Sequence, residues 1–181
     1  PDVLEKWQHK FQYIHVDEFQ DVGNIEYRLV KLMSQDAITC VVGDPDQTIY
    51  SFRGANVNYI LDFDKDFKPC KTVILDQNYR STGNILNISN SLIRKNRNRL
   101  EKDLYTEATG GSEVIHYMGK SEQEEADYIC SQIEKIISEV DGVNYRDFAI
   151  LYRANYLSRT IEQSMISYGI DYRIFGGLKF F

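Results

Sequence analysis

The 181 residues carry 27 Asp and Glu against 21 Lys and Arg, a formal net charge of −6 at pH 7. Hydrophobic residues make up 43% of the chain and charged residues 27%, which is typical of a globular protein and excludes disordered or collagen-like chains. This acidic balance argues against a protein that coats nucleic acid, although not against an enzyme with a local DNA groove. The apolar runs are too short to span a membrane, so we expect no membrane segment.

Five short apolar runs have the length of β-strands, and they cover Tyr13–Val16, 39–42, 72–75, 114–117 and 148–152. Continuous apolar runs of this length are typical of parallel strands covered on both faces. Between them, apolar residues recur at spacings of three and four, which predicts helices. The stripes are Ile25, Leu29, Leu32 and Met33; Ile85, Ile88 and Leu92; Ala126, Ile129, Ile133, Ile137 and Val140; and Leu157, Ile161 and Met165. This alternation predicts an α/β fold, with a parallel sheet and crossover helices.

Three widely spaced cysteines, Cys40, Cys70 and Cys130, match neither a disulfide framework nor a metal-binding pattern. We therefore expect buried thiols and a reducing, cytoplasmic location. A domain boundary is expected near Asp76, because the more acidic first part ends there on a predicted strand and a new motif begins at Gln77.

The first predicted strand ends in two adjacent carboxylates, Asp17 and Glu18. In the Walker B arrangement, a strand delivers an Asp to Mg²⁺ at its carboxyl end. The neighbouring Glu is then placed to polarise an attacking water. An acidic loop after a strand is the commoner interpretation of these two residues alone, and His15 is better interpreted as a packed strand side chain than as a ligand.

The second predicted strand is followed by Gly-Asp-Pro-Asp-Gln at 43–47, and α/β sheets place ligands at such strand ends. Gln47 offers the amide that a γ-phosphate sensor needs. Tyr50 and Phe52, followed by Arg53, offer aromatic faces on which single-stranded DNA bases stack. A turn followed by two core aromatics explains the same spacing equally well.

Gln-Asn-Tyr-Arg-Ser-Thr at 77–82 precedes the second helical stripe. Ser81 or Thr82 can cap this helix, and Arg80 could reach an anion from just before the helix N-terminus. By itself, however, this pattern is better explained as a surface Arg beside a helix cap.

Two further features bear on phosphate binding. The five basic residues between 94 and 102 could lie along a DNA backbone or form a solvated helix end. No P-loop, Gly-x₄-Gly-Lys-Ser/Thr, occurs in the chain. The nearest match, at 119–121, has Val114 where the first Gly is required, and Ser121 with Glu124 is better explained as a capping box.

Taken together and in this order, the motifs at 17–21, 43–55 and 77–82 resemble the UvrD/PcrA/Rep group of superfamily 1 DNA helicases. The stretches at 145–153 and 176–181 fit the same group, so the resemblance covers essentially the whole chain. It implies two RecA-like domains with ATP between them and movement from 3′ to 5′ along one DNA strand.

On the map that the resemblance implies, residues 1–76 are the C-terminal part of the first RecA-like domain. Residues 77–181 are then the N-terminal part of the second. The family's P-loop lies well before the Asp-Glu motif and its later Arg-bearing motif would lie beyond Phe181. The resemblance therefore implies an internal fragment, which we expect to be inactive in isolation.

The resemblance also implies roles around ATP. Asp17 would coordinate Mg²⁺ on ATP, and Glu18 would activate the hydrolytic water. Gln47 would sense the γ-phosphate. Arg80 would reach the γ-phosphate across a domain cleft, with Tyr79 beside it.

The implied DNA contacts lie in the middle motif. Tyr50 and Phe52 would line the path of single-stranded DNA, and Arg53 would link that path to the ATP site. Phe52 stands where the family usually carries Trp, so stacking should survive with less area. Single-stranded and forked DNA are the implied partners, and repair or replication proteins are candidate partners.

The resemblance thus predicts an ATP-dependent helicase that couples hydrolysis to translocation and duplex unwinding. Two alternatives stay open. The chain could be a non-catalytic module derived from a helicase that binds single-stranded DNA or a protein. It could also be the helicase part of a recombination helicase–nuclease.

Overall fold

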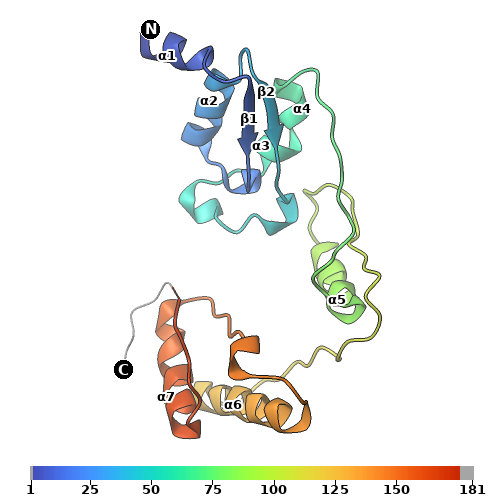
Figure 1. Ribbon diagram of the computed structural model, residues 1–181, viewed down its shortest axis with the longest axis vertical. Helices are drawn as coiled ribbons and strands as arrows, with labels where there is room; N and C mark the ends of the chain where they lie inside the picture. Colours follow the sequence, from blue (N-terminus) through green and yellow to red (C-terminus); the bar gives the residue numbers. More distant parts are fainter. Residues whose placement is uncertain (1, 176–181) are drawn as a thin grey trace. The chain divides into compact units, whose positions relative to one another are not determined.

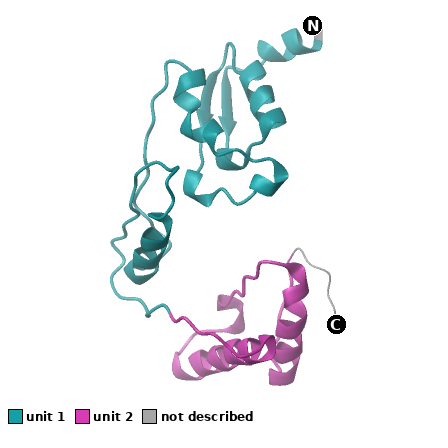
Figure 2. Ribbon diagram, turned by 180° about the vertical axis from the view of Figure 1, so that it is seen from behind, with its two compact units in different colours: residues 1–114 teal, residues 115–181 magenta. Residues whose placement is uncertain are grey.

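The computed structural model describes residues 2–175, so the predicted motif at 176–181 lies outside the described residues. The chain forms two compact units, residues 1–114 and residues 115–181 (Figure 2). The domain boundary expected near Asp76 stays a prediction. Within the described part, no helix has the length and apolar composition needed to cross a lipid bilayer.

The first unit contains a parallel pair of strands (Figure 1). Strand β1 (Tyr13–Val16) pairs with β2 (Ile38–Val41), and helix α2 (Asn24–Met33) lies between them in sequence. The register places Val16 opposite Val41. A parallel pair joined by a helix is an α/β arrangement, as the sequence predicts. The second strand begins and ends one residue earlier than expected.

An aromatic cluster packs against one face of this strand pair. Phe19, Tyr27 and Phe63 are its buried members, and Val16 and Val41 pack against them. The side chain of Phe63 meets that of Phe19 edge to face, with ring centroids 5.5 Å apart. Two short helices complete the cover, α3 (Asn58–Leu61) and α4 (Phe63–Asp66). Burial of these rings removes apolar area from water and stabilises this region.

The opposite face of the strand pair is exposed, which corrects two expectations. Tyr13 and Ile38 lie opposite each other and are 61% and 66% exposed. Coverage on both faces is therefore wrong for these strands, because no described element packs on the second face. The prediction of buried thiols is also wrong for Cys40, which lies on that exposed face, and for Cys70, which is exposed as well. It is confirmed for Cys130, which is buried.

Three of the five predicted strands do not form within the described residues: the runs at 72–75, 114–117 and 148–152 have no strand assignment. A strand needs backbone hydrogen bonds to a neighbour, and these runs have no described neighbour that supplies them. The one isolated bridge among the described residues joins Gln77 to Tyr105. Apolar composition alone therefore overpredicts strands here.

All four predicted helices form. Helix α2 matches the first stripe, and the others match α5 (Gly83–Ile93), α6 (Glu122–Glu139) and α7 (Ser158–Tyr168). Helix α1 (Asp2–Gln8) was not expected. Short 3-10 turns are Phe19–Asp21, Pro45–Gln47, Ser51–Arg53, Tyr145–Asp147 and Asn155–Leu157.

The second unit is a helix pair with its own core. Cys130 and Ile133 of α6 pack with Met165 of α7 and with Ile170. In α5 of the first unit, by contrast, the predicted stripe is largely exposed, and Leu86 is the buried apolar residue.

Candidate functional site

The candidate site lies where the two parallel strands end. The backbone N–H of Val42 donates to Val16 at 2.8 Å, and that of Phe19 donates to the Val42 carbonyl at 2.9 Å. These bonds continue the pairing one step beyond the strands. They bring Asp17 and Glu18 next to the turn at 43–47, as expected for the carboxyl ends of neighbouring parallel strands.

Gln20 joins the two strand ends. Its side-chain nitrogen donates to Glu18 Oε2 at 2.6 Å, and its oxygen accepts the backbone N–H of Asp44 at 3.0 Å. The residue is only 1% exposed. Sequence reasoning did not single out Gln20. Its one available signal was an amide inside the acidic motif at 17–21.

Gly43 makes this junction possible. A Cβ placed there would lie 2.5 Å from Gln20 Oε1 and 3.0 Å from the backbone nitrogen of Phe19. Both distances are shorter than ordinary carbon contacts, so a larger residue would displace the Gln20 amide. The glycine is needed for close approach rather than for an unusual backbone angle.

Glu18 adopts a left-handed backbone conformation, with φ 50° and ψ 40°. It is the one residue other than glycine with positive φ in the described part of the chain. Such conformations are costly for a side chain with a Cβ and concentrate at functional sites. The Glu18 N–H donates to Asp17 Oδ1 at 2.9 Å, and both carboxylates are exposed at the end of β1.

Asp44 organises the turn after β2. One of its oxygens accepts the Asp46 N–H at 3.0 Å, and the other accepts the Gln47 side-chain amide at 2.8 Å. Lys102 also forms an ion pair with this carboxylate. Burial on its own raises the Asp44 pKa, but hydrogen bonds from Lys102 and Gln47 and the Lys102 charge outweigh it. The net pKa is below its ordinary value.

The basic segment between 94 and 102 begins at the C-terminus of α5, where the exposed Arg94 is the helix C-cap, and it is not a free cationic track. Helix α5 stops at Ile93, and three of the five cations contact carboxylates. Arg94 pairs with Asp103, while Arg99 and Lys102 pair with the turn after β2. Charge neutralisation of this kind leaves less positive charge for phosphate than composition suggests.

The aromatic pair predicted to meet DNA forms one cluster at the same end of the strands. Tyr50 and Phe52 have ring centroids 6.0 Å apart, and the Arg53 guanidinium carbon lies 5.1 Å and 5.7 Å from the two rings. These are cation–π distances. Phe52 is 67% exposed, so a core role is wrong for its side chain.

This aromatic segment contacts the loop that follows Glu18. The backbone N–H of Asn56 donates to the Val22 carbonyl at 3.2 Å. A Cβ at Gly23 would lie 3.2 Å from the Gly54 carbonyl oxygen, so the two backbones approach closely. The acidic loop and the aromatic segment therefore form one continuous surface region.

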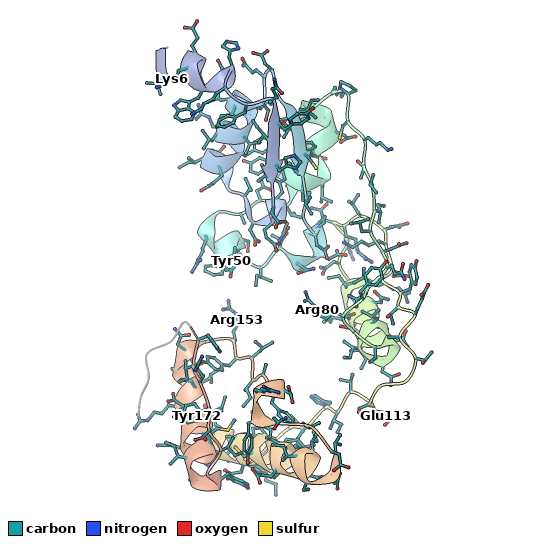
Figure 3. All side chains as sticks on the ribbon, viewed as in Figure 1. Lys6, Tyr50, Arg80, Glu113, Arg153 and Tyr172 are labelled. Atoms are coloured by element: carbon teal, nitrogen blue, oxygen red, sulfur yellow. The ribbon has the colours of Figure 1, made fainter. Side chains whose placement is uncertain are left out.

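Tyr79 and Arg80 precede α5 and are both exposed; Figure 3 labels Arg80 beside that helix. The hydroxyl of Tyr79 donates to Gln77, and Asn78 Oδ1 accepts the N–H of Arg80 at 2.9 Å and of Ser81 at 2.7 Å. Among the described residues, no hydrogen bond or ion pair joins Arg80 to Asp17, Glu18 or Gln47.

The helix caps differ in part from expectation. Thr82 is the N-cap of α5 but makes no side-chain capping bond. At α6, Ser121 accepts the Glu124 N–H at 3.2 Å, which confirms the Ser121 half of the predicted capping box. The Glu124 carboxylate reaches the N–H of Lys120 rather than that of Ser121.

The carboxylates suit a magnesium ion that arrives with a nucleotide. Across residues 2–175, no group of three or more His, Cys, Asp or Glu could hold a metal by itself. Mg²⁺ in nucleotide sites is bound by one or two carboxylates together with phosphate oxygens. The Asp17 side chain is exposed and fits that description.

Comparison with known proteins identifies the family. Residues 1–68 match the UvrD/REP helicase N-terminal domain, and residues 73–181 match the UvrD-like helicase C-terminal domain. Proteins named ATP-dependent DNA helicase PcrA from Leuconostoc citreum, Staphylococcus epidermidis and Staphylococcus aureus are each 45% identical over 182 residues. The matches cover 100% of this chain and 24–25% of those relatives, so the chain spans about a quarter of their length. The chain belongs to the UvrD-like helicase family.

Proposed function

We propose that this protein is an ATP-dependent DNA helicase, in which ATP hydrolysis drives 3′-to-5′ movement on single-stranded DNA and unwinding of the duplex. One observation carries the proposal: Asp17 and Glu18 follow β1, Gln47 lies in the turn after the neighbouring parallel strand, and an exposed aromatic cluster lies beside them. Gln20 and Asp44 link Glu18 to Gln47 by hydrogen bonds. We assign residues 1–76 and 77–181 to two RecA-like domains. Family membership supports this assignment.

In this proposal, Asp17 would hold the Mg²⁺ that accompanies ATP, and that ion would supply positive charge to the phosphates. Glu18 accepts a proton from the attacking water. The Gln47 amide contacts the γ-phosphate. Arg80 contacts the same phosphate, with Tyr79 beside the nucleotide; a cation of this kind is worth ~10³–10⁵ in rate.

Tyr50 and Phe52 form the proposed stacking surface for single-stranded DNA. Arg53, which contacts both rings, links this surface to the ATP site in the same proposal. Forked DNA is the substrate for unwinding. A cytoplasmic location and partners among repair or replication proteins are part of the same proposal.

The sequence contains no P-loop, and the P-loop backbone and lysine hold the phosphates in this class of enzyme. We therefore propose that these 181 residues alone do not hydrolyse ATP. A non-catalytic helicase-derived module remains the alternative from another class, and hydrolysis by the full-length protein distinguishes the two.

The test is Glu18→Gln in the full-length protein, measured as ATP turnover with single-stranded DNA and as ATP binding. Loss of the general base should lower turnover by about 10²–10⁴-fold and leave ATP binding intact. Glu107→Gln, an exposed carboxylate in the same unit, is the matched control. Near-normal turnover of Glu18→Gln contradicts the general-base role, and no turnover in the unsubstituted protein favours the binding module.

The DNA surface is tested by Phe52→Ala, which should weaken single-stranded DNA binding by ~1–3 kcal/mol through loss of one stacking face. Phe52→Trp should bind at least as tightly as the unsubstituted protein. Ile49→Ala removes exposed apolar area from the same segment without removing a ring, so it should bind normally. Equal loss in Ile49→Ala would contradict stacking.

A further inference from the structure

Two ion pairs connect the turn after β2 to the segment that follows α5. Arg99 Nη2 lies 3.0 Å from Asp46 Oδ2 and its Nε lies 3.2 Å from Asp46 Oδ1, a two-pronged contact. Lys102 pairs with Asp44 and lies 4.0 Å from Asp46 Oδ2. The two acids are separated from the two bases by 53 and 58 residues of sequence.

These pairs are shielded from water. The Arg99 and Asp46 side chains are 9% and 10% exposed. The Arg94 and Asp103 side chains, by contrast, are 58% and 51% exposed. Shielded pairs with good geometry are costly to break because a charge is left without its partner. Arg99 also donates to the Lys102 carbonyl at 2.7 Å, so the two bases form one unit.

The ion pairs lead directly to the candidate site. Asp44, held by Lys102, accepts the Gln47 amide at 2.8 Å. The Asp44 backbone N–H donates to Gln20, and Gln20 in turn donates to Glu18 at 2.6 Å. A continuous path of hydrogen bonds therefore runs from Lys102 to both site side chains.

We propose that Arg99 and Lys102 are positioning residues of the ATP-hydrolysis site. By binding Asp46 and Asp44 they hold the turn that carries Gln47, and through Gln20 they hold Glu18. The Arg99–Lys102 clamp lies in the region that matches the C-terminal family domain, whereas the side chains it holds lie in the N-terminal one. This inference rests on the proposed function, because the positioned groups are those assigned to hydrolysis.

The test is Lys102→Met in the full-length protein, with kcat and KM for ATP measured at saturating single-stranded DNA. Methionine keeps the apolar stem and removes the charge. Misplacement of groups that act in the transition state should lower kcat by about 10- to 100-fold. KM should stay within about threefold, since ground-state binding is not the target. Lys102→Arg should restore most of kcat.

Two controls separate the clamp from a general loss of positive charge. Lys95→Met and Arg97→Met remove exposed cations of the same segment that form no ion pair among the described residues. Both should keep kcat unchanged. If these control variants lose as much kcat as Lys102→Met, the clamp is overturned. It is also overturned if Lys102→Met keeps the kcat of the unsubstituted protein.

A double variant covers failure to fold. Lys102→Met leaves the Asp44 carboxylate without its cation, so the single variant could lose stability, which urea unfolding would report. Lys102→Met with Asp44→Asn removes both charges. Its kcat should match that of Asp44→Asn alone within about twofold, because both changes break one path. If the kcat losses of the two single variants add in the double variant, the clamp is overturned but the proposed function is not. If the unsubstituted protein does not hydrolyse ATP, both the proposed function and the clamp are overturned.

Discussion

The buried side-chain oxygen of Gln20 accepts the backbone N–H of Asp44 at 3.0 Å, which ties the loop after β1 to the turn after β2. This bond matters because the sheet has only two strands here, and their ends have no other lateral support from a described strand. The same amide reaches Glu18, so the geometry of one buried residue affects both halves of the candidate site.

Gln20→Ala should therefore weaken both the fold and the site. It leaves the Asp44 N–H without its acceptor, which should lower the free energy of unfolding by ~1–3 kcal/mol. Urea unfolding of the chain, followed by fluorescence of its one tryptophan, Trp7, measures this. Gln35→Ala, at an exposed position, is the control. Equal stability of the two variants would contradict a structural role for the Gln20 amide.

Gly43→Ala should destabilise the chain by overpacking. Its Cβ would collide with Gln20 Oε1, and such forced shifts cost ~1–3 kcal/mol. Gly83→Ala is a matched control, because a Cβ at this first residue of α5 meets nothing within 4 Å. That variant should be neutral or more stable by ~0.4–1 kcal/mol. The urea concentration at the midpoint of unfolding is measured for both variants. Similar midpoints would contradict the close approach of Gly43 to the Gln20 side chain.

The left-handed backbone at Glu18 predicts a specific order of stability. Glu18→Gly and Glu18→Ala both lose the carboxylate and its bond to Gln20, but only alanine retains the penalty of a Cβ at φ 50°. Glu18→Gly should be more stable than Glu18→Ala by ~1 kcal/mol, and both should lack ATP turnover. Thermal and urea unfolding compare them directly. If Glu18→Ala were as stable as Glu18→Gly, or more stable, residue 18 would not have the left-handed backbone conformation.

The ion pair at Asp44 predicts a pH dependence of stability. The pKa of Asp44 in the folded chain lies below its ordinary value. As the pH falls, the unfolded chain therefore takes up a proton at this carboxylate before the folded chain does, and this favours unfolding. The stabilisation that the charged Asp44 gives the fold is fully present above the pKa of an Asp in the unfolded chain, about 3.9. It is lost as the pH falls through the lower pKa of Asp44 in the folded chain.

Urea unfolding between neutral and strongly acidic pH measures this effect. Asp44→Asn should be less stable than the unsubstituted chain at neutral pH, and the difference should narrow below about pH 4. Asp76→Asn, at an exposed site in the same unit, should follow the unsubstituted chain throughout. A difference that stays constant to acid pH would show that the Asp44 charge does not stabilise the fold.

Local features of the chain were predictable because their signals are local. The α6 stripe and its Ser121 cap lie within one segment, and the structure confirms both. Strand β1 was found at its predicted bounds, since it has a partner in β2. The runs at 72–75 and 148–152 have similar composition but no described partner, and pairing is a property of two segments rather than one.

The sequence by itself determined the order of the motifs, the family and the residue types offered for nucleotide and DNA contacts. Tertiary structure alone decided that Gln20 joins Glu18 to Asp44 and that Arg99 and Lys102 reach across 53 and 58 residues to the same turn. It also decided that Cys40 is exposed. The physical reason is that burial and ion pairing depend on which distant segments pack together, and no periodicity within a single segment encodes that choice.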